Sequence, residues 1–527
     1  MKKRIISLLI SIVLGFVYYY FALPALNIHC ISFWIFVFFV GAVYAGSNFL
    51  MSYDFVTGNI YKLVGDVKVI CYAFVGMFIL IMGYNLILSP MFNSNKYKNR
   101  IEVVDGVFSE DVSIVDFNSL ALVDKDSSMK LGDRVMGAMP ELVSQFYVSN
   151  LYTQINYNGG VYRVTPLEYD GFIKYLSNRK EGIKGYITVN SVNGEANLVK
   201  LDKGMKYVPS AILGEDLYRK LRFTYPTFIF GKESFEIDEE GNPYFVVPVI
   251  KYSGVGLLKD VKGVVVLDPV SGSSDYYLKD QIPAWIDNVY KSDIVISQIN
   301  DYGKYRGGFW NSIFGQKNVV KTTEGYNYMA MNDDIYLYTG ITSTLSDESN
   351  IGFVLTNMRT KATKFYTIAG AEEYSAMASS EGQVQQMGYT STFPLLINLN
   401  NRPTYLMSLK DNAGLVKMYS FVDVVDYQKV VVSDASLGIE SASHNYLDKM
   451  GFDDFSDTYI EKKIKVKSIK SYNIDGNSYF YITDSDNNKY SVSIKVNKNI
   501  LPFIEVDDTV KIKYIDDAEI KEIVEIK

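Results

Sequence analysis

Residues 5–26 (IISLLISIVLGFVYYYFALPAL), 31–50 (ISFWIFVFFVGAVYAGSNFL) and 69–88 (VICYAFVGMFILIMGYNLIL) are apolar stretches that contain no Asp, Glu, Lys or Arg. A helix rises about 1.5 Å per residue, so each stretch is long enough to cross about 30 Å of hydrocarbon. From residue 93 onward the chain is polar and rich in tyrosine. We therefore expect a transmembrane domain with three helices over residues 1–92, followed by a large soluble region.

The link between the first two stretches, residues 27–30, is so short that we expect these spans to form an antiparallel hairpin. A cleavable signal peptide is the alternative for the first stretch, because residues 2–4 are basic. The apolar run is too long for that, and it passes through three tyrosines at 18–20. A second span also follows at once, so we interpret the first stretch as a permanent span.

Basic residues near the spans predict the orientation, because cytoplasmic loops carry an excess of Lys and Arg. Residues 2–4 and the loop 51–68 together carry five of them, whereas residues 96–100 carry three. This bias predicts a multi-pass protein of the cell membrane with a cytoplasmic N-terminus and the bulk of the chain extracytoplasmic. Both cysteines, Cys30 and Cys71, lie at span edges, and a cysteine-free soluble region suits an exposed location without disulfide machinery.

The spans are interpreted as an anchor rather than a transport pathway, because charged residues inside the membrane usually mark a pathway. The three stretches contain none, and His29 lies in a link. The net charge of −7 lacks the basic balance expected of a nucleic-acid binder. We therefore expect the membrane lipid bilayer and an envelope protein or polymer as partners, and no nucleic acid.

Residues 93–432 show a mixed α+β pattern in which a strand, a β-hairpin and a helix recur about three times. The hairpin turn at 268–272 has the Asp-x-x-x-Gly form, the turn at 190–194 is close to it, and the third copy after residue 352 lacks the glycine. This repeated unit resembles the PepSY type of extracytoplasmic module, with three unrelated hairpins as the alternative. The expected helices lie at 211–221, 282–290 and 371–387.

The end of the chain is predicted to be a separate small domain. Residues 433–459 are polar and acidic and are expected to be a linker. Residues 460–527 contain five short strand-like runs with one longer connection, which predicts an OB-like β-barrel. Twelve Lys balance twelve Asp and Glu in this part, so its surface is not an electrostatic nucleic-acid groove.

Catalytic motifs are scarce. Histidine occurs only at positions 29 and 444, and a Ser-His-Asp or Cys-His arrangement would need His444, which falls in the predicted linker. Zinc sites built from Cys and His are excluded by the same scarcity. Ser177 and Lys180 have Ser-x-x-Lys spacing, but the companion motifs of the penicillin-binding enzymes are missing.

Carboxylates remain as candidates. Adjacent pairs occur at 333–334, 347–348 and 372–373. Neighbours on a strand point to opposite faces, and acids at a helix start are stabilised by the helix dipole, so structural explanations suffice. Residues 484–488 (DSDNN) begin like a calcium loop but lack its glycine and its final glutamate, which favours a hairpin turn. The sequence therefore predicts no catalytic, cofactor-binding or metal-ligating residue, and no cofactor.

Six strings carry a resemblance to a group of large, uncharacterised multi-pass membrane proteins of Gram-positive bacteria, some of which have a CvpA-like label. The resemblance covers residues 1 to about 430 and implies no activity, because none is assigned to the group. The strings are LGDRVMG (131–137), YTQINY (152–157), FEIDEEGNPY (235–244), AEEYSA (371–376), PTY (403–405) and LKDNAGLVK (409–417).

Together these observations favour a non-catalytic, membrane-anchored extracytoplasmic scaffold or binding protein of the cell envelope. The chain has 43 Tyr and 30 Phe, and exposed tyrosines suit recognition of sugars or partner proteins. An envelope hydrolase or transferase that uses carboxylates is the first alternative, and it requires a cleft with two acids, at least one with a raised pKa. A transport accessory subunit is the second.

Overall fold

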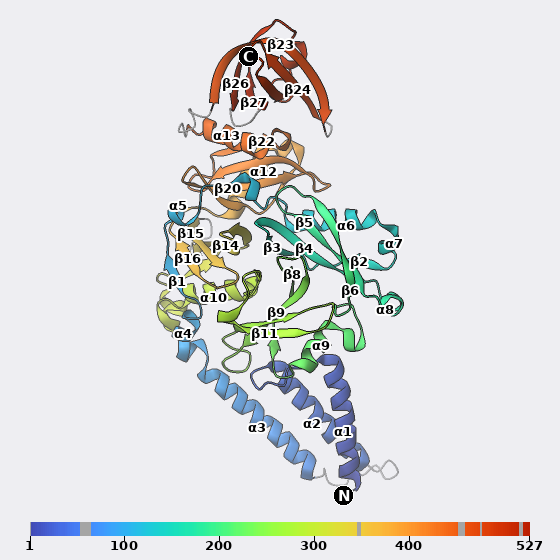
Figure 1. Cartoon of the computed structure of the whole chain (residues 1–527). Coiled ribbons are helices and arrows are strands. Elements are labelled where there is room, and N and C mark those ends of the chain that lie inside the picture. The colour runs from blue at the N-terminus through green and yellow to red at the C-terminus, as the bar shows by residue number, and fades with distance from the viewer. Residues whose placement is uncertain (1, 53–64, 345–348, 452–458, 475–476, 516–519) are drawn as a thin grey trace. The chain divides into compact units, whose positions relative to one another are not determined.

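The computed structural model describes residues 2–52, 65–344, 349–451, 459–474, 477–515 and 520–527 (Figure 1). The chain divides into two compact units. Unit 1 comprises residues 1–107 and 118–368, and unit 2 comprises residues 108–117 and 369–527. The predicted α+β region over 93–432 contributes residues to both units.

Three N-terminal helices are long and apolar enough to cross a membrane, as expected. The first helix ends four residues earlier than the apolar stretch, because Pro24 cannot continue a helix and disfavours helical backbone at the preceding residue. Leu23 accordingly adopts a φ of 48°. The helices are α1 (Lys2–Ala22), α2 (Ile31–Ser52) and α3 (Gly65–Ile87).

Four sheets follow along the chain and share one five-strand pattern of connectivity, to which the third sheet adds further strands. In each sheet two long neighbouring strands form the centre, two short strands precede them and pair with the first long strand, and one strand returns along the second. The first sheet has the order β2-β4-β5-β6 with β3 on β4, and the second has the order β7-β9-β10-β11 with β8 on β9. Their strands are β2 (Phe146–Val148), β3 (Thr153–Tyr157), β4 (Gly160–Tyr169), β5 (Ile183–Asn190), β6 (Ala196–Met205), β7 (Ile229–Phe230), β8 (Ser234–Ile237), β9 (Pro243–Lys251), β10 (Asp260–Leu267) and β11 (Ser274–Leu278).

The third sheet completes unit 1, and the fourth lies in unit 2. The third has the order β12-β14-β15-β16-β1 with β13 on β14, and the fourth has the order β18-β20-β21-β22 with β19 on β20. Their strands are β1 (Val103–Asp105), β12 (Val320–Thr322), β13 (Asn327–Met331), β14 (Asp334–Ser343), β15 (Ser349–Asn357), β16 (Thr363–Tyr366), β18 (Thr390–Ser391), β19 (Leu395–Leu399), β20 (Arg402–Lys410), β21 (Val416–Asp423) and β22 (Val430–Asp434).

A helix precedes each sheet in the chain. The helix expected at 282–290 is wrong: backbone amides of this stretch bond outside it, that of Asp287 to the Glu236 carboxylate and those of Val289 and Tyr290 to the Met358 carbonyl. The helix before the third sheet starts at Ser292. The four helices are α6 (Lys125–Gly137), α9 (Leu217–Thr224), α10 (Ser292–Lys304) and α12 (Glu373–Gln383), and shorter elements are α4 (Pro90–Lys98), α5 (Phe108–Asp111), α7 (Pro140–Val143), α8 (Phe172–Asn178), α11 (Gly308–Trp310) and β17 (Gly370–Ala371).

Two further expectations need correction. The sequence predicted about three repeated units, but the structure has four sheets of this kind. The predicted linker 433–459 is folded where it is described, because β22 ends in it and α13 (Ile439–Lys449) follows. Ala442, Tyr446 and Leu447 are buried on that helix, which packs against β21 and β22. Ser443 is itself buried and His444 and Asn445 are half-buried, so polar residues are interspersed with the apolar ones and the amphipathic pattern of α13 is weak.

The hairpin turns of the first three sheets share one side-chain device. The side-chain oxygen of Asn190, Asp268 or Asn357 accepts hydrogen bonds from the backbone amides two and three residues later. The fifth residue of each turn has a left-handed backbone, with a φ of 76° at Gly194, 75° at Gly272 and 66° at Lys361. The third copy therefore keeps the turn without the glycine, since the Asx side chain supplies the same hydrogen bonds.

The end of the chain forms a closed barrel of five strands in the order β23-β24-β25-β27-β26, with β25 and β27 parallel. Alternate residues such as Ile464, Val466, Ile482 and Ile512 fill its interior. Pro502 lies in the longer connection, as expected, where no ladder hydrogen bond is needed. The strands are β23 (Tyr459–Ile474), β24 (Asn477–Asp484), β25 (Lys489–Ser493), β26 (Thr509–Ile515) and β27 (Ile520–Ile526).

We expect Gly272→Ala to destabilise the protein by about 1–3 kcal/mol, because alanine strains a left-handed position and its Cβ has no room. A Cβ at Gly272 would lie 2.4 Å from the Tyr207 ring. The measurement is the midpoint of thermal unfolding of the full chain in detergent micelles. Gly137→Ala is the matched control, because a Cβ there meets nothing within 4 Å. Equal midpoints for the two variants would contradict this account of the turn.

Candidate ligand-binding groove

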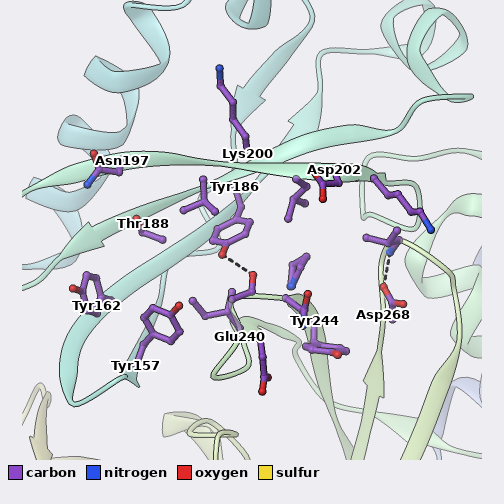
Figure 2. A pocket seen from close by; sticks show the side chains of 18 residues that line it. Tyr157, Tyr162, Tyr186, Thr188, Asn197, Lys200, Asp202, Glu240, Tyr244 and Asp268 are labelled. Atoms are coloured by element: carbon purple, nitrogen blue, oxygen red, sulfur yellow. Dashed lines mark hydrogen bonds between the residues drawn. The ribbon is translucent and has the colours of Figure 1, made fainter.

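A cavity of about 860 Å³ opens in unit 1 between the first and second sheets (Figure 2). One wall is the face of β4, β5 and β6, and the other is formed by two turns of the second sheet. These turns are the β8–β9 turn, residues 238–242, and the β10–β11 turn, residues 268–272. We call this cavity the groove. Its walls come from two repeats, so it exists only when both sheets are folded and packed.

A tyrosine and a glycine form the floor of the groove. Tyr186 on β5 is 1 % exposed and donates a hydrogen bond from its hydroxyl to the Gly241 carbonyl at 2.8 Å. Gly241 has a φ of 82°, and a Cβ there would lie 3.4 Å from the hydroxyls of both Tyr157 and Tyr186. The Tyr186 ring packs edge-on against Phe235 in the core, with centroids 5.7 Å apart. The floor is therefore held by core packing on one side and by a hydrogen bond on the other.

Further tyrosines line the walls. The rings of Tyr157 and Tyr162 pack edge to face with centroids 5.9 Å apart. On the opposite wall the Tyr244 ring lies 5.0 Å from the Trp285 ring. Burial, reinforced by the Asp238 carboxylate, raises the pKa of Tyr244 to about 12. Tyr244 therefore stays neutral near pH 7 and offers a ligand both an apolar face and a hydroxyl.

Charged side chains at the rim balance one another. Lys200 and Lys203 carry two positive charges, and Asp202 and Glu240 carry two negative ones. Within the part of the chain that the structure describes, none of these four side chains is hydrogen-bonded or ion-paired. Lys200 points away from the tyrosines in Figure 2. Asp268 also faces the groove, but its carboxylate accepts hydrogen bonds within its own turn. With Asp268 included, the groove is lined by two positive and three negative side chains, so it offers polar contacts with little net charge.

The carboxyl groups with raised pKa values lie elsewhere in unit 1. Glu236 and Asp287 are 0 % and 2 % exposed, and neither lines the groove. The Asp287 amide donates to Glu236 at 2.8 Å, and the Asn156 amide donates to Asp287 at 2.6 Å. Burial raises both pKa values, and the Glu236 charge raises that of Asp287 further. Burial also lowers the pKa of the neighbouring Lys291 to about 8, against the attraction of Glu236.

This buried acid pair has a structural explanation. Its backbone partners come from β3 and from the segment before α10, so the two carboxyls join the first sheet, the second sheet and that segment. Buried carboxyls are tolerated when they are hydrogen-bonded, and protonation removes the cost of a buried charge. The pair therefore contributes to packing between repeats rather than to chemistry in the groove.

The candidates from sequence are dispersed. His444 lies half-buried on α13 rather than in a linker, and His29 contacts the Gly254 carbonyl through Nδ1 at 3.1 Å. The Ser177 hydroxyl donates to the Ile173 carbonyl within its own helix. Asp334 forms a two-point ion pair with Arg359 at 2.7 and 2.8 Å.

The remaining acidic candidates also have structural settings. The pair 372–373 lies at the start of α12, as expected, and Glu373 is buried. Residues 484–488 form the hairpin turn between β24 and β25. In this turn the Asp484 carboxylate accepts hydrogen bonds from the backbone amides of Asp486 and Asn488. The pair 347–348 lies outside the described residues. Among the described residues no group of three or more His, Cys, Asp or Glu side chains could hold a metal ion.

Sequence reasoning did not identify the groove residues. The surplus of tyrosine was the available signal, and the Asp238–Gly241 turn was noted only within a longer string. Comparison with models of protein families finds no match, and comparison with curated proteins finds none either. The groove must therefore be interpreted from its own geometry.

We expect Asp287→Asn to stabilise the fold by about 1–3 kcal/mol near pH 7 and by less near pH 4. An acid whose pKa is raised by folding contributes stability below its unfolded pKa of about 4, and that contribution is lost as the pH rises through the folded value. The variant keeps an oxygen for the Asn156 amide and cannot ionise. Thermal unfolding midpoints of the full chain in detergent at the two pH values measure the effect.

Asp202→Asn on the groove rim is the control for this pH dependence, because Asp202 is exposed. Its midpoints should follow those of the unaltered protein at both pH values. An equal gain for Asp287→Asn near pH 4 and near pH 7 would show that ionisation of this carboxyl does not weaken the fold.

Proposed function

We propose that this protein is a membrane-anchored, non-catalytic binding protein of the cell envelope, which holds a hydroxyl-rich polymer such as a glycan strand in the groove. The observation that carries the proposal is the set of four tyrosines, at 157, 162, 186 and 244, that line one cavity between two sheets. Tyrosine combines a flat apolar face with a polar tip, which suits a ligand that has both apolar ring faces and hydroxyls.

The rim supports the same ligand class. Two lysines and two free carboxylates offer hydrogen bonds to hydroxyls and amides without favouring a strongly charged ligand. The cavity volume of about 860 Å³ suits a few units of a polymer. The cavity lies between repeats, a common position for binding sites in multi-domain proteins.

The architecture supports a scaffold assembled from repeated modules. The four sheets share one connectivity and an Asx hairpin turn recurs, which favours the PepSY-like interpretation of the repeats. The strand order of the terminal barrel and its one parallel pair favour an OB-like barrel. Such modules serve many functions, so they support the architecture and not a specific ligand.

A hydrolase or transferase that uses carboxylates is less well supported. That function needs an acid with a raised pKa in the cleft, so that it is protonated near neutral pH. Glu236 and Asp287, whose pKa values are raised by burial, are enclosed between the sheets. A transport accessory role would need polar residues along a gap between the spans, whereas the buried Ser11 hydroxyl and the Asn48 side-chain amide each donate to a carbonyl of their own helix.

We expect Tyr162→Ala to weaken binding of glycan strands prepared from peptidoglycan by about tenfold, because it removes one aromatic face of the groove. Trp285 contacts Tyr244, so its emission reports occupancy of the groove. The titration uses the full chain in detergent with Trp34 and Trp310 replaced by Phe.

Tyr427→Ala is the matched control, because Tyr427 is 43 % exposed and lies outside the groove. This variant should bind as the parent does. If the parent shows no response to glycan strands but responds to the peptide stems of peptidoglycan, the ligand class is wrong while the groove is retained. If Tyr162→Ala and Tyr427→Ala bind equally, the groove is not the site.

The orientation is tested separately. We expect protease added to intact protoplasts to digest the chain beyond residue 93, because the proposed topology places this region outside. Antibodies against the terminal barrel would follow the loss of the full-length band. Complete protection of the barrel in intact protoplasts, together with digestion after lysis, would reverse the orientation. The groove would then face the cytoplasm, and a glycan of the cell envelope could not be its ligand.

A further inference from the structure

An exposed aromatic segment lies in unit 1 at the end of α10. It comprises α11 and the π-helix Asn311–Gly315, and we call it the 308–315 segment. Trp310 is 56 % exposed and Phe314 is 78 % exposed, and their rings stack with centroids 5.9 Å apart. Ile313 between them is also exposed. Large side chains gathered at such exposure usually mark an interaction site.

The neighbouring helix α4 is tied to the end of the third membrane span. Only residues 88–89 separate α3 from α4. The Asn93 side-chain amide donates to the Ile87 carbonyl at 2.5 Å, and the Tyr97 hydroxyl donates to the Leu88 carbonyl at 3.2 Å. Both bonds satisfy carbonyls at a helix end that lack intrahelical partners. Helix α4 is therefore fixed where α3 leaves the membrane.

The 308–315 segment is fixed to α4 in turn. Helices α10 and α11 both pack against α4 (Figure 1). The Tyr97 and Tyr305 rings lie 6.0 Å apart, and Arg100 forms an ion pair with Asp301 on α10. Helix α4 itself exposes Met91 and Phe92, the latter 63 % exposed. Exposed apolar side chains therefore occur on two elements that pack together, and one of them directly follows a candidate membrane span.

The charge of these two stretches is one-sided. Residues 302–323 contain four Lys or Arg and no Asp or Glu, with Asp301 and Glu324 as the flanking acids. Residues 88–101 contain Lys96, Lys98 and Arg100 and no acid, and of these Arg100 is already paired with Asp301. Aromatic side chains beside basic ones are typical of segments that lie at the bilayer interface, with rings among the headgroups and basic groups near lipid phosphates. A soluble protein partner would not require this position beside a span.

We infer that the 308–315 segment and α4 form a second, peripheral membrane contact, in which Trp310 and Phe314 insert among lipid headgroups and the flanking basic residues face anionic lipid phosphates. This inference rests on the membrane anchoring proposed above. The contact would limit tilting of unit 1 on its three spans, because it adds a point of attachment to the side of α3.

Tryptophan quenching by brominated lipids tests this contact. The chain has three tryptophans, so three single-tryptophan variants of the full protein can be made, retaining Trp34, Trp310 or Trp285. Each is placed in nanodiscs of phosphatidylcholine and phosphatidylglycerol whose acyl chains are brominated near the headgroup. Trp34 lies at the start of the second span, whereas Trp285 packs against Tyr244 beside the groove. We expect strong quenching of Trp34 and Trp310 and none of Trp285.

The outcomes separate this inference from the anchoring itself. Quenching of Trp34 without quenching of Trp310 would overturn the second contact and retain the spans, whereas absence of both would overturn the anchoring. If Trp310 is shielded from lipid and also from aqueous acrylamide, a protein covers the segment and the inference fails.

The basic residues are tested in the Trp310 variant with Lys304, Arg306 and Lys317 replaced by Gln. We expect these changes to reduce quenching at least twofold in discs that contain phosphatidylglycerol and to have little effect in pure phosphatidylcholine. Unchanged quenching in both lipids would remove the phosphate contact from the inference. Circular dichroism equal to that of the parent shows that each variant is folded.

Discussion

A buried arginine joins the end of the first membrane span to the second sheet. Arg222 on α9 is 7 % exposed and donates to the Leu23 carbonyl at 3.0 Å and to the Phe228 carbonyl at 2.6 Å. The Leu23 carbonyl needs an outside partner because Pro24 ends the helix there. A guanidinium suits this position, since charged donors make stronger hydrogen bonds and its fork reaches several acceptors. The end of helix α1 thereby fixes where the second sheet begins.

The loop between β9 and β10 makes a second joint with the spans. Asn85 on α3 exchanges two hydrogen bonds with Val255, and His29 contacts Gly254 and Gly256. The opposite ends of the same two strands carry the turns that form one wall of the groove. Strand β9 has 9 residues, which span about 30 Å at about 3.3 Å each. One strand pair thus holds the groove at a fixed distance from the membrane joint.

The sequence predicted those features that depend on local periodicity. The three spans, the hairpins at 190–194 and 268–272 and the barrel strands all follow from apolar patterns and turn residues that are close together in the chain. The predictions of a helix at 282–290 and of a linker at 433–459 were both wrong. Residues 282–290 form a buried connection with an irregular backbone rather than a helix. Within residues 433–459 the short helix α13 buries only one narrow face. Neither departure leaves a local signal.

The groove could not be predicted because its parts are distant in sequence and similar to the core in composition. Tyr186 and Gly241 are 55 residues apart in the sequence. They meet only because the face of the first sheet packs against a turn of the second sheet. The same packing separates the acids by environment: those between the sheets are enclosed and have raised pKa values, whereas Asp202 and Glu240 at the rim are exposed. For the proposed binding function, the groove tyrosines supply apolar ring faces and hydroxyls, and Asp202 and Glu240 supply exposed carboxylates.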